Sequence, residues 1–209
     1  MSELKALIAQ GEHQQLDFKF RIDDSKKIAR TLCAFANTDG GRLLIGVKDN
    51  GKIAGVDPNE EIHMIEAAAE MYCNPKLKIE TRVWQEDMKL VLDIWVEKTT
   101  KKPIMAFDEE GRMRAYVRVK DSTLLANKIL LGVWRRAHFE NDRPQQFGEN
   151  EIELLKNITS DGITLSKLYR TVNLKQREID NLLIRFVSWK LVQMNISESE
   201  TLYSVSNTI

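Results

Sequence analysis

The sequence predicts an α+β protein with a mixed sheet and helices, followed by a smaller domain of three helices and a hairpin. Over the first two thirds of the 209 residues, helical segments alternate with short strands and hairpin turns. A polar stretch containing Pro144 and Gly148 then interrupts this pattern, as linkers often do. We therefore predict a domain at 1–138, a linker at 139–148 and a second domain at 149–209.

The first elements follow from the spacing of apolar residues. In chain order, we expect a short helix containing Leu4, Leu7 and Ile8, a strand at 15–20, a buried helix at 28–37 and a strand at 42–47. Gly40 and Gly41 explain how the buried helix ends, because glycine accepts the positive φ that a helix C-terminus often needs. No Gly-Lys-Ser/Thr follows this turn, so it is not a phosphate-binding P-loop.

The rest of the first domain is dominated by hairpins. Asp49-Asn50-Gly51 is a typical hairpin turn, and Asp57-Pro58-Asn59 can open a helix that stops near Pro75. Alternating apolar residues predict a strand at 89–96, since every second side chain lies on the same face. The remaining elements expected are strands at 52–56, 78–84 and 112–120 and a helix at 124–134.

The C-terminal domain has the element order of a winged helix-turn-helix. We expect helices at 149–156, 164–172 and 175–189, and then a hairpin with strands at 191–195 and 202–205. Apolar residues at helical spacing in the third helix predict that one of its faces packs inward. The start of that helix would then be free to contact a partner.

Composition excludes several classes of protein. Hydrophobic residues make up 43% and charged residues 30%, as in ordinary soluble proteins, and no apolar run approaches the ~20 residues that span a membrane. The N-terminus lacks the pattern of a secretory signal. Cys33 and Cys73 are isolated thiols without metal-ligand spacing, which suggests a reducing compartment. We expect a cytoplasmic protein that has no membrane partner.

The neutral overall charge hides an uneven distribution. Residues 1–97 carry 13 basic and 17 acidic side chains, whereas residues 98–136 carry 10 basic and 4 acidic ones. Local potential steers phosphate partners more than the total charge does. The basic segment is therefore a candidate for contact with nucleic acid.

Three short motifs resemble the Schlafen/Alba-like family of domains. They are Glu12 with Asp17-Phe18-Lys19, then Ala34-Phe35-Ala36-Asn37-Thr38-Asp39-Gly40-Gly41, and then Ile45-Gly46-Val47-Lys48-Asp49. The segment from Tyr116 to Thr123 is similar to the family's closing segment, although Lys-Asp replaces its usual glycine region. The resemblance covers about residues 12–128 and implies an α+β fold and a role with nucleic acids.

The same resemblance implies a site for metal-dependent cleavage. Glu12, Asp17 and Asp49 match the positions that ribonuclease-active relatives use as a carboxylate triad, and converging carboxylates can hold Mg²⁺ or Mn²⁺. Asp17 stands where relatives more often have glutamate, and its shorter side chain weakens such a site. In the simpler interpretation all three are surface carboxylates. We expect weak or absent cleavage, and a metal only if the protein is a nuclease; no other cofactor is expected.

Basic residues in two places are the candidate contacts with nucleic acid. Period-two alternation puts five residues of the strand 112–120 on one face: Arg112, Arg114, Tyr116, Arg118 and Lys120. Cations interleaved with an aromatic ring suit a phosphate backbone with a stacked base. The alternative is a plain solvated face. Lys19 and Arg42, which flank the family motif, are further candidates.

The third helix of the C-terminal domain provides the second place. Lys175, Gln176 and Arg177 stand at its start, where a recognition helix contacts base edges and phosphates. The hairpin tip at 197–200 is acidic and would repel a DNA backbone. We therefore predict a nucleic-acid-binding protein, first of all a DNA-binding transcriptional regulator. RNA as the target, an endoribonuclease, and a protein-interaction module that forms a homodimer stay open as alternatives.

Overall fold

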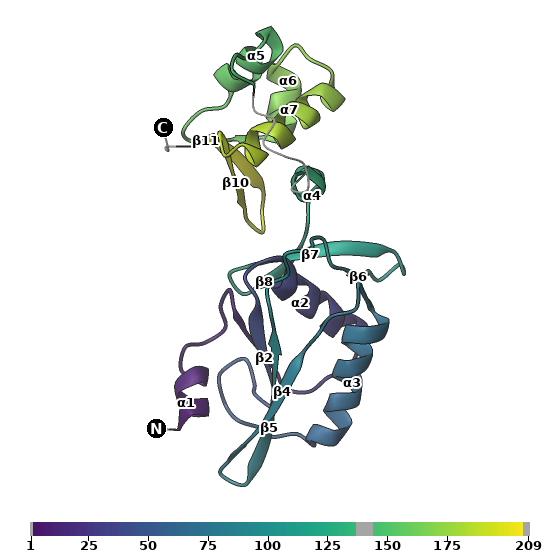
Figure 1. The fold of residues 1–209 in the computed structure, drawn as a ribbon. Helices are drawn as coiled ribbons and strands as arrows, with labels where there is room; N and C mark the ends of the chain where they lie inside the picture. Colours follow the sequence, from purple (N-terminus) through teal and green to yellow (C-terminus); the bar gives the residue numbers. More distant parts are fainter. Residues whose placement is uncertain (1, 137–143, 207–209) are drawn as a thin grey trace. The chain divides into compact units, whose positions relative to one another are not determined.

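The structure, a computed structural model, describes residues 2–136 and 144–206. The chain divides into two compact units, Met1–Ala126 and Asn127–Ile209 (Figure 1). Both contain helices and sheets, which confirms the predicted α+β class. Among the described residues, no helix has both the length and the apolar character needed to cross a membrane.

The first unit contains two four-stranded sheets. Its elements are α1 (Glu3–Ile8), β1 (Leu16–Lys19), α2 (Ser25–Asn37), β2 (Gly41–Ile45), α3 (Pro58–Met71), β3 (Cys73–Asn74), β4 (Glu80–Glu86), β5 (Lys89–Val96), β6 (Met105–Phe107), β7 (Met113–Val119) and β8 (Ser122–Leu125). The first sheet has the order β1-β2-β5-β4, with β1 parallel to β2 and the other pairs antiparallel. The second sheet has the order β3-β6-β7-β8 and is antiparallel.

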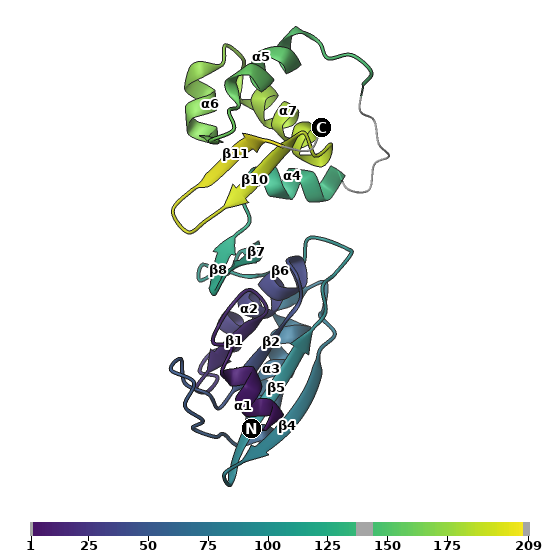
Figure 2. The same cartoon turned by 90° about the vertical axis from the view of Figure 1, so that its left-hand side faces the viewer.

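Helix α2 forms the centre of the main core. The Asp24 side chain accepts a hydrogen bond from the Lys26 amide at its start, a typical N-cap. Leu32 and Phe35 are fully buried and pack with apolar side chains from α3 and from both sheets. Helix α1 covers part of the opposite face of the first sheet, where Leu4 packs in a smaller cluster (Figure 2).

The turn after α2 requires both of its glycines. Gly40 has a φ of +72°, and a Cβ atom there would lie 2.9 Å from the Val96 carbonyl oxygen. A Cβ atom on Gly41 would lie 2.4 Å from the Phe35 ring. The Gly40 amide donates to the Phe35 carbonyl at 2.8 Å, which ends the helix as the sequence predicts.

Two predicted elements of the first unit differ from the structure. Residues 52–56 form no strand and make only an isolated bridge between Val47 and Ile53. The helix expected at 124–134 starts later, because Ser122–Leu125 pairs with β7 instead. Helix α4 (Lys128–Arg136) begins only after this strand.

The second unit contains α4, three further helices and one small sheet. After α4 come α5 (Glu149–Asn157), β9 (Ile163–Thr164), α6 (Leu165–Thr171), α7 (Gln176–Ser188), β10 (Val192–Ile196) and β11 (Thr201–Val205). The sheet has the order β10-β11-β9 and is antiparallel. Leu168, Leu183 and Phe186 are fully buried in a core separate from that of the first unit.

Helix α4 packs with the second unit, although the sequence places it in the first domain. Ile129 is fully buried in the core around α7. A Cβ atom on Gly132 would lie 2.2 Å from the Ile184 side chain, so the two helices touch closely there. The division between the units falls after Ala126 rather than at the predicted 138. Part of the predicted linker, 139–143, lies outside the described residues.

Candidate nucleic-acid interface

Glu12 and Asp17 come together around one lysine. Lys19 Nζ lies 2.7 Å from Asp17 Oδ2 and 4.0 Å from Glu12 Oε1. Glu12 Oε1 also accepts a hydrogen bond from the Phe18 amide at 2.9 Å. Partial burial raises the pKa of Glu12, and the neighbouring Asp17 carboxyl raises it further. Glu12 and Asp17 therefore lie close together around Lys19.

A second cation closes the site on the inner side. Arg118 Nη2 donates to Asp17 Oδ1 at 2.9 Å, and both side chains are almost completely buried. The Arg118 guanidinium also lies 5.2 Å from the centre of the Phe35 ring. This ion pair joins β1 to β7 and keeps the Asp17 charge neutralised.

Asp49 lies in a different place from the other two carboxylates. It is exposed and lines an open cavity of about 710 Å³ together with Phe18 and Lys52. Side chains of neighbouring residues in a strand point to opposite faces, so Phe18 faces the α1 cluster and Asp17 faces away from it. Within residues 2–136 and 144–206, no group of three or more His, Cys, Asp or Glu could hold a metal ion. The arrangement therefore does not fit a triad for Mg²⁺ or Mn²⁺.

The strand β7 does not present its five candidate residues on one exposed face. Arg112 and Arg114 are exposed, but both are paired with Asp108, at 3.2 Å and 3.4 Å. Tyr116 and Arg118 are buried, at 6% and 3% of their exposed area, because α2 covers this side of the strand. The structure leaves only the two ends of the strand accessible, with Arg112 and Arg114 at its start and Lys120 just after its last residue.

Asp108, the carboxylate beside Arg112 and Arg114, is itself held by several hydrogen bonds. The Asp108 side chain accepts from the backbone amides of Arg112 and Glu110 and from the side chains of Arg112 and Arg114. These bonds, with the Arg112 amide first, lower the pKa of Asp108 to about 2. Asp108 thus offsets the two arginines that the sequence assigns to phosphate contact.

Lys19 and Arg42 are both engaged by carboxylates. Lys19 lies between Glu12 and Asp17, as described above. Arg42 makes a two-pronged ion pair with the buried Asp93, and its Nε donates to Asp93 Oδ1 at 3.2 Å. The Arg42 guanidinium lies over the ring of Trp95, 5.5 Å from its centre.

The start of α7 differs, because its cations are accessible and not offset. Lys175, Gln176 and Arg177 are exposed, and within the described part of the chain no carboxylate pairs with Lys175 or Arg177. Lys175 and Arg177 border an open cavity of about 380 Å³, which Asn181, Arg185, Glu151 and Glu178 also line. Together with Lys120, this group is the part of the predicted binding set that the structure leaves accessible to an anionic partner.

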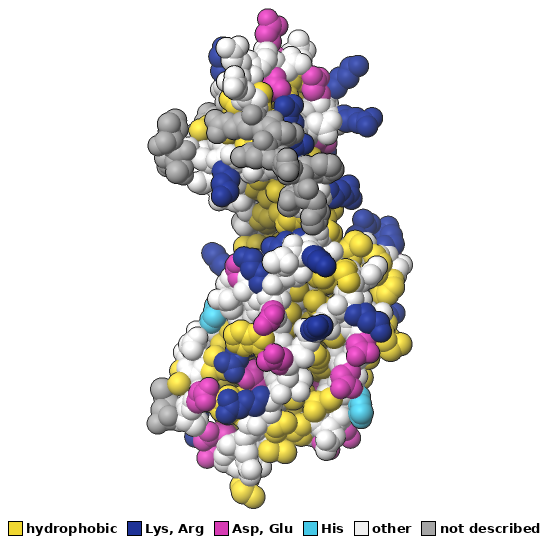
Figure 3. All heavy atoms as spheres, in the orientation of Figure 1, with side chains coloured by type: hydrophobic (Ala, Val, Ile, Leu, Met, Phe, Trp, Pro, Cys, Tyr) yellow, Lys and Arg dark blue, Asp and Glu magenta, His cyan; other side chains and the backbone are white. Residues whose placement is uncertain are grey.

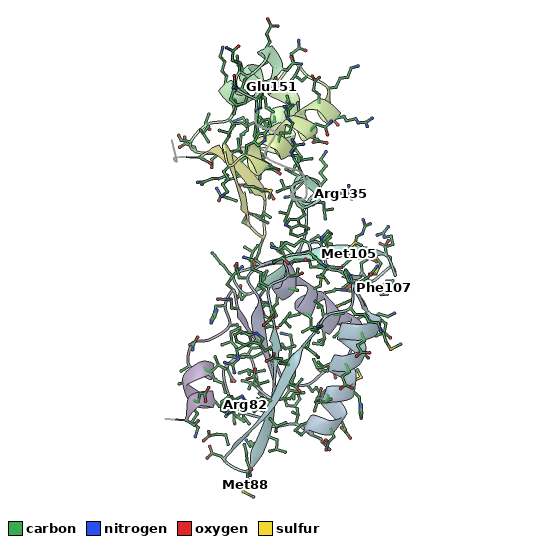
Figure 4. All side chains as sticks on the ribbon, viewed as in Figure 1. Arg82, Met88, Met105, Phe107, Arg135 and Glu151 are labelled. Atoms are coloured by element: carbon green, nitrogen blue, oxygen red, sulfur yellow. The ribbon has the colours of Figure 1, made fainter. Side chains whose placement is uncertain are left out.

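A second cation–aromatic pair, which is not among the residues predicted from the sequence, lies on β4. The guanidinium of Arg82 lies 3.5 Å from the centre of the Trp84 ring. Figure 4 shows Arg82 on the side of the sheet that carries α1. The period-two spacing of Arg82 and Trp84 is the same signal that drew attention to β7, and could have identified this strand.

One comparison with known proteins identifies the family of the first unit. A model of the family described as Schlafen, AlbA_2 matches residues 12–127, more than half of the chain. Among curated proteins, none matches this chain significantly.

Two solved structures are similar over a large part of the chain. One is the crystal structure of the DIP2311 protein from Corynebacterium diphtheriae, with 18% identity, a TM-score of 0.47, and coverage of 96% of this chain and 37% of that one. The other is the solution structure of an N-terminal domain from Nitrosomonas europaea, from a protein described as related to the ATP-dependent DNA helicase RecG. It has 23% identity, a TM-score of 0.46, and coverage of 70% of this chain and 100% of that one. This chain thus spans little more than a third of the Corynebacterium structure.

Proposed function

Because this chain belongs to the Schlafen, AlbA_2 family over residues 12–127, we propose that it is a nucleic-acid-binding protein, and more specifically a DNA-binding transcriptional regulator. In this proposal the second unit is a winged helix that contacts duplex DNA. The first unit supplies the family domain, and the start of α7 supplies the contacts with the duplex.

The element order of the second unit supports the winged-helix interpretation. A helix, a short strand, two helices and a hairpin follow one another as α5, β9, α6, α7, β10 and β11. The short strand β9 joins the hairpin, so the three strands form one small sheet. In this arrangement the third helix, α7, is the recognition helix, and its N-terminal residues reach the bases and phosphates.

The exposed start of α7 is the single observation that carries the proposal. Two cations, Lys175 and Arg177, stand next to the amides Gln176 and Asn181, a combination that can contact both phosphates and base edges. The nearest acidic side chain of the helix, Glu178, is held by a hydrogen bond of 2.6 Å from Asn150. Lys175 and Arg177 are exposed, so phosphate can approach both cations.

The interaction-module alternative has its own support. The tip of the β10–β11 hairpin carries Glu198 and Glu200, which repel a phosphate backbone. Ile152 and Val205 are partly exposed, at 42% and 38%. A protein partner or a second copy of the chain would suit these features, and the winged helix would then pair subunits.

The nuclease alternative is not favoured by the geometry. Asp17 is neutralised by Lys19 and Arg118, and Asp49 faces a separate cavity. Three carboxylates must lie within about 2.0–2.6 Å of one ion to act as a metal site.

A double substitution tests the proposal. Lys175→Ala with Arg177→Ala should weaken binding to duplex DNA about tenfold or more and lower the salt slope by roughly one unit per lost phosphate contact. Fluorescence anisotropy of a labelled duplex at several salt concentrations measures both.

The control is Lys156→Ala, which removes an exposed cation from the last turn of α5. It should change affinity and slope little. If the wild-type chain binds no duplex, or the double variant binds as tightly as the wild type, α7 is not the contact.

A further inference from the structure

Part of one face of the first sheet remains outside the cover of α1. Three neighbouring strands carry its side chains, and the registers place Arg42 beside Trp95 and Trp95 beside Glu80. Two residues along the strands, Asp93 lies beside Arg82. Figure 2 shows α1 over one part of this face, with β4 and β5 extending beside it. We call Arg42, Arg82, Trp84, Asp93 and Trp95 the tryptophan platform.

A buried carboxylate fixes the platform from below. Asp93 is only 4% exposed, and it accepts hydrogen bonds from Arg42 Nε at 3.2 Å and from Trp84 Nε1 at 2.9 Å. These bonds hold the Arg42 guanidinium over one face of the Trp95 ring and the Trp84 ring beneath the Arg82 guanidinium. The aromatic and guanidinium planes are thus ordered before any ligand arrives, so a ligand need not order them.

The outer part of the platform is accessible. Trp95 is 44% exposed, and the Arg82 side chain is 59% exposed. In the described part of the chain, Arg82 is paired only with Glu3, at 3.8 Å, a weak contact between exposed groups. The negative charge of Asp93 is buried and paired with Arg42. The platform therefore presents the Trp95 ring with Arg42 beside it on β2, Glu80 beside it on β4, and Arg82 two residues further along β4.

We propose that the tryptophan platform binds single-stranded nucleic acid, with a base stacked on Trp95 and the backbone near Arg42 and Arg82. This inference rests on the proposed nucleic-acid role and adds a substrate class and a second contact surface. A stacked base suits one exposed ring, because every base has a flat π-face, and a cationic rim matches its phosphate.

The size and charge of the tryptophan platform argue against a protein partner, and its single exposed ring argues against duplex DNA. A stable protein interface needs about 800 Å² on each partner with an apolar centre, whereas charged groups flank Trp95 on both sides. In the space-filling view, basic and hydrophobic side chains of the first unit are interspersed and form no single large patch (Figure 3). Bases within a duplex are stacked on one another, so the ring could not reach their faces.

One acidic residue provides a test with the opposite sign. Glu80 lies directly across the ladder from Trp95, and it is exposed with no ion pair among the described residues. Its charge would repel a phosphate bound to the platform. Glu80→Gln should therefore strengthen binding of a single strand, by a few-fold at low salt.

The experiment compares variants of the full chain on two probes, labelled oligothymidylate and a labelled blunt duplex. Trp95→Ala should weaken binding of the single strand about 5- to 100-fold and leave duplex binding unchanged. Trp95→Phe should keep most of the affinity, because the smaller ring still stacks. Val83→Ala, at an exposed residue of β4 whose side chain lies on the other face, is the matched control.

The outcomes separate this inference from the proposed function. If the single strand binds Trp95→Ala and Glu80→Gln as it binds the wild type, the platform is not a binding surface, even where the duplex depends on Lys175 and Arg177. If the single strand binds through Trp95 and the duplex does not bind, the platform stands and the role of α7 fails. If the wild type binds neither probe, both fall.

Discussion

At the scale of single residues, surroundings decide what each motif residue can do. Asp17 and Arg118 belong to the segments that identify the family, and both carry charges suited to catalysis or phosphate contact. The structure instead places them 2.9 Å apart in the interior. Their charges are used to hold β1 against β7, because a buried charge needs a partner.

Breaking this ion pair should therefore cost stability. Arg118→Ala leaves the Asp17 carboxylate buried beside Lys19 alone, and we expect a loss of about 3–5 kcal/mol in the free energy of unfolding. Urea denaturation followed by circular dichroism measures it. Arg114→Ala, which removes an exposed ion pair on the same strand, should cost under about 1 kcal/mol. Equal losses for the two variants would contradict the burial of Arg118.

Glu12 should make stability depend on pH. Its pKa in the folded protein lies above the ordinary 4.5, since burial and the Asp17 carboxyl disfavour its charge. The folded state therefore binds the proton more tightly, and this contribution is present below about pH 4.5 and lost as pH rises through the folded pKa.

Glu12→Gln should accordingly be more stable than the wild type at pH 7, with the advantage shrinking as the pH falls towards 4. Glutamine keeps an oxygen that can accept from the Phe18 amide. Denaturant unfolding of both proteins at three pH values measures the difference. A difference that stays constant with pH would show that the charge of Glu12 is not the cause.

At the scale of elements, local patterns predicted most helices and strands, and long-range pairing explains the exceptions. Apolar spacing placed the helix at 175–189, and the structure has it at Gln176–Ser188. Leu124 and Leu125 also fit a helix, but their backbone pairs with Val117 and Tyr116 of β7. The residues next to Leu124 and Leu125 in the sequence do not indicate which strand will pair with them.

The candidate site shows the same division. Alternation correctly groups Tyr116 with Arg118, since period two is local geometry, but it cannot tell that α2 covers their side of the strand. Glu12 and Asp17 can be expected to lie close together, because they are the two ends of a segment of only six residues. Asp49 lies apart from Glu12 and Asp17 because of the face of the sheet that its loop joins. The spacing of residues in the sequence does not specify that face.

The β6–β7 hairpin permits a prediction about one element. The pKa of Asp108 is lowered to about 2 by the hydrogen bonds that close the turn, first of all from the Arg112 amide. Its contribution to the hairpin is present above the ordinary value of 3.8 and lost as the pH falls through about 2. The carboxyl resonance of Asp108, followed by NMR, should titrate near 2. A midpoint at 3.8 would mean that the turn is open in solution.

At the scale of the whole molecule, the chain has two main cores that share no residues. Leu32 belongs to the core around α2, and Leu183 belongs to the core around α7, and both are fully buried. Each core has its own set of helices and at least one sheet. This organisation predicts that the units lose their structure separately.

Two core substitutions test this independence. Leu32→Ala and Leu183→Ala should each cost about 2–5 kcal/mol, because each leaves a cavity. In scanning calorimetry, each should lower the melting temperature of one transition and leave the other unchanged. A shift of both transitions by either substitution would show that the two cores unfold together.

The close packing at Gly132 places the boundary between the two units before α4, whereas the polar stretch in the sequence comes after α4. Because α4 packs closely against Ile184, a second unit that is cut from the chain after α4 would lose part of its own core. Anyone exchanging modules between such proteins should join the halves after Ala126, so that Ile129 travels with its partners. In a hybrid joined at 138, the second unit would lack α4, and the apolar side chains that normally pack against Ile129 would be exposed to solvent.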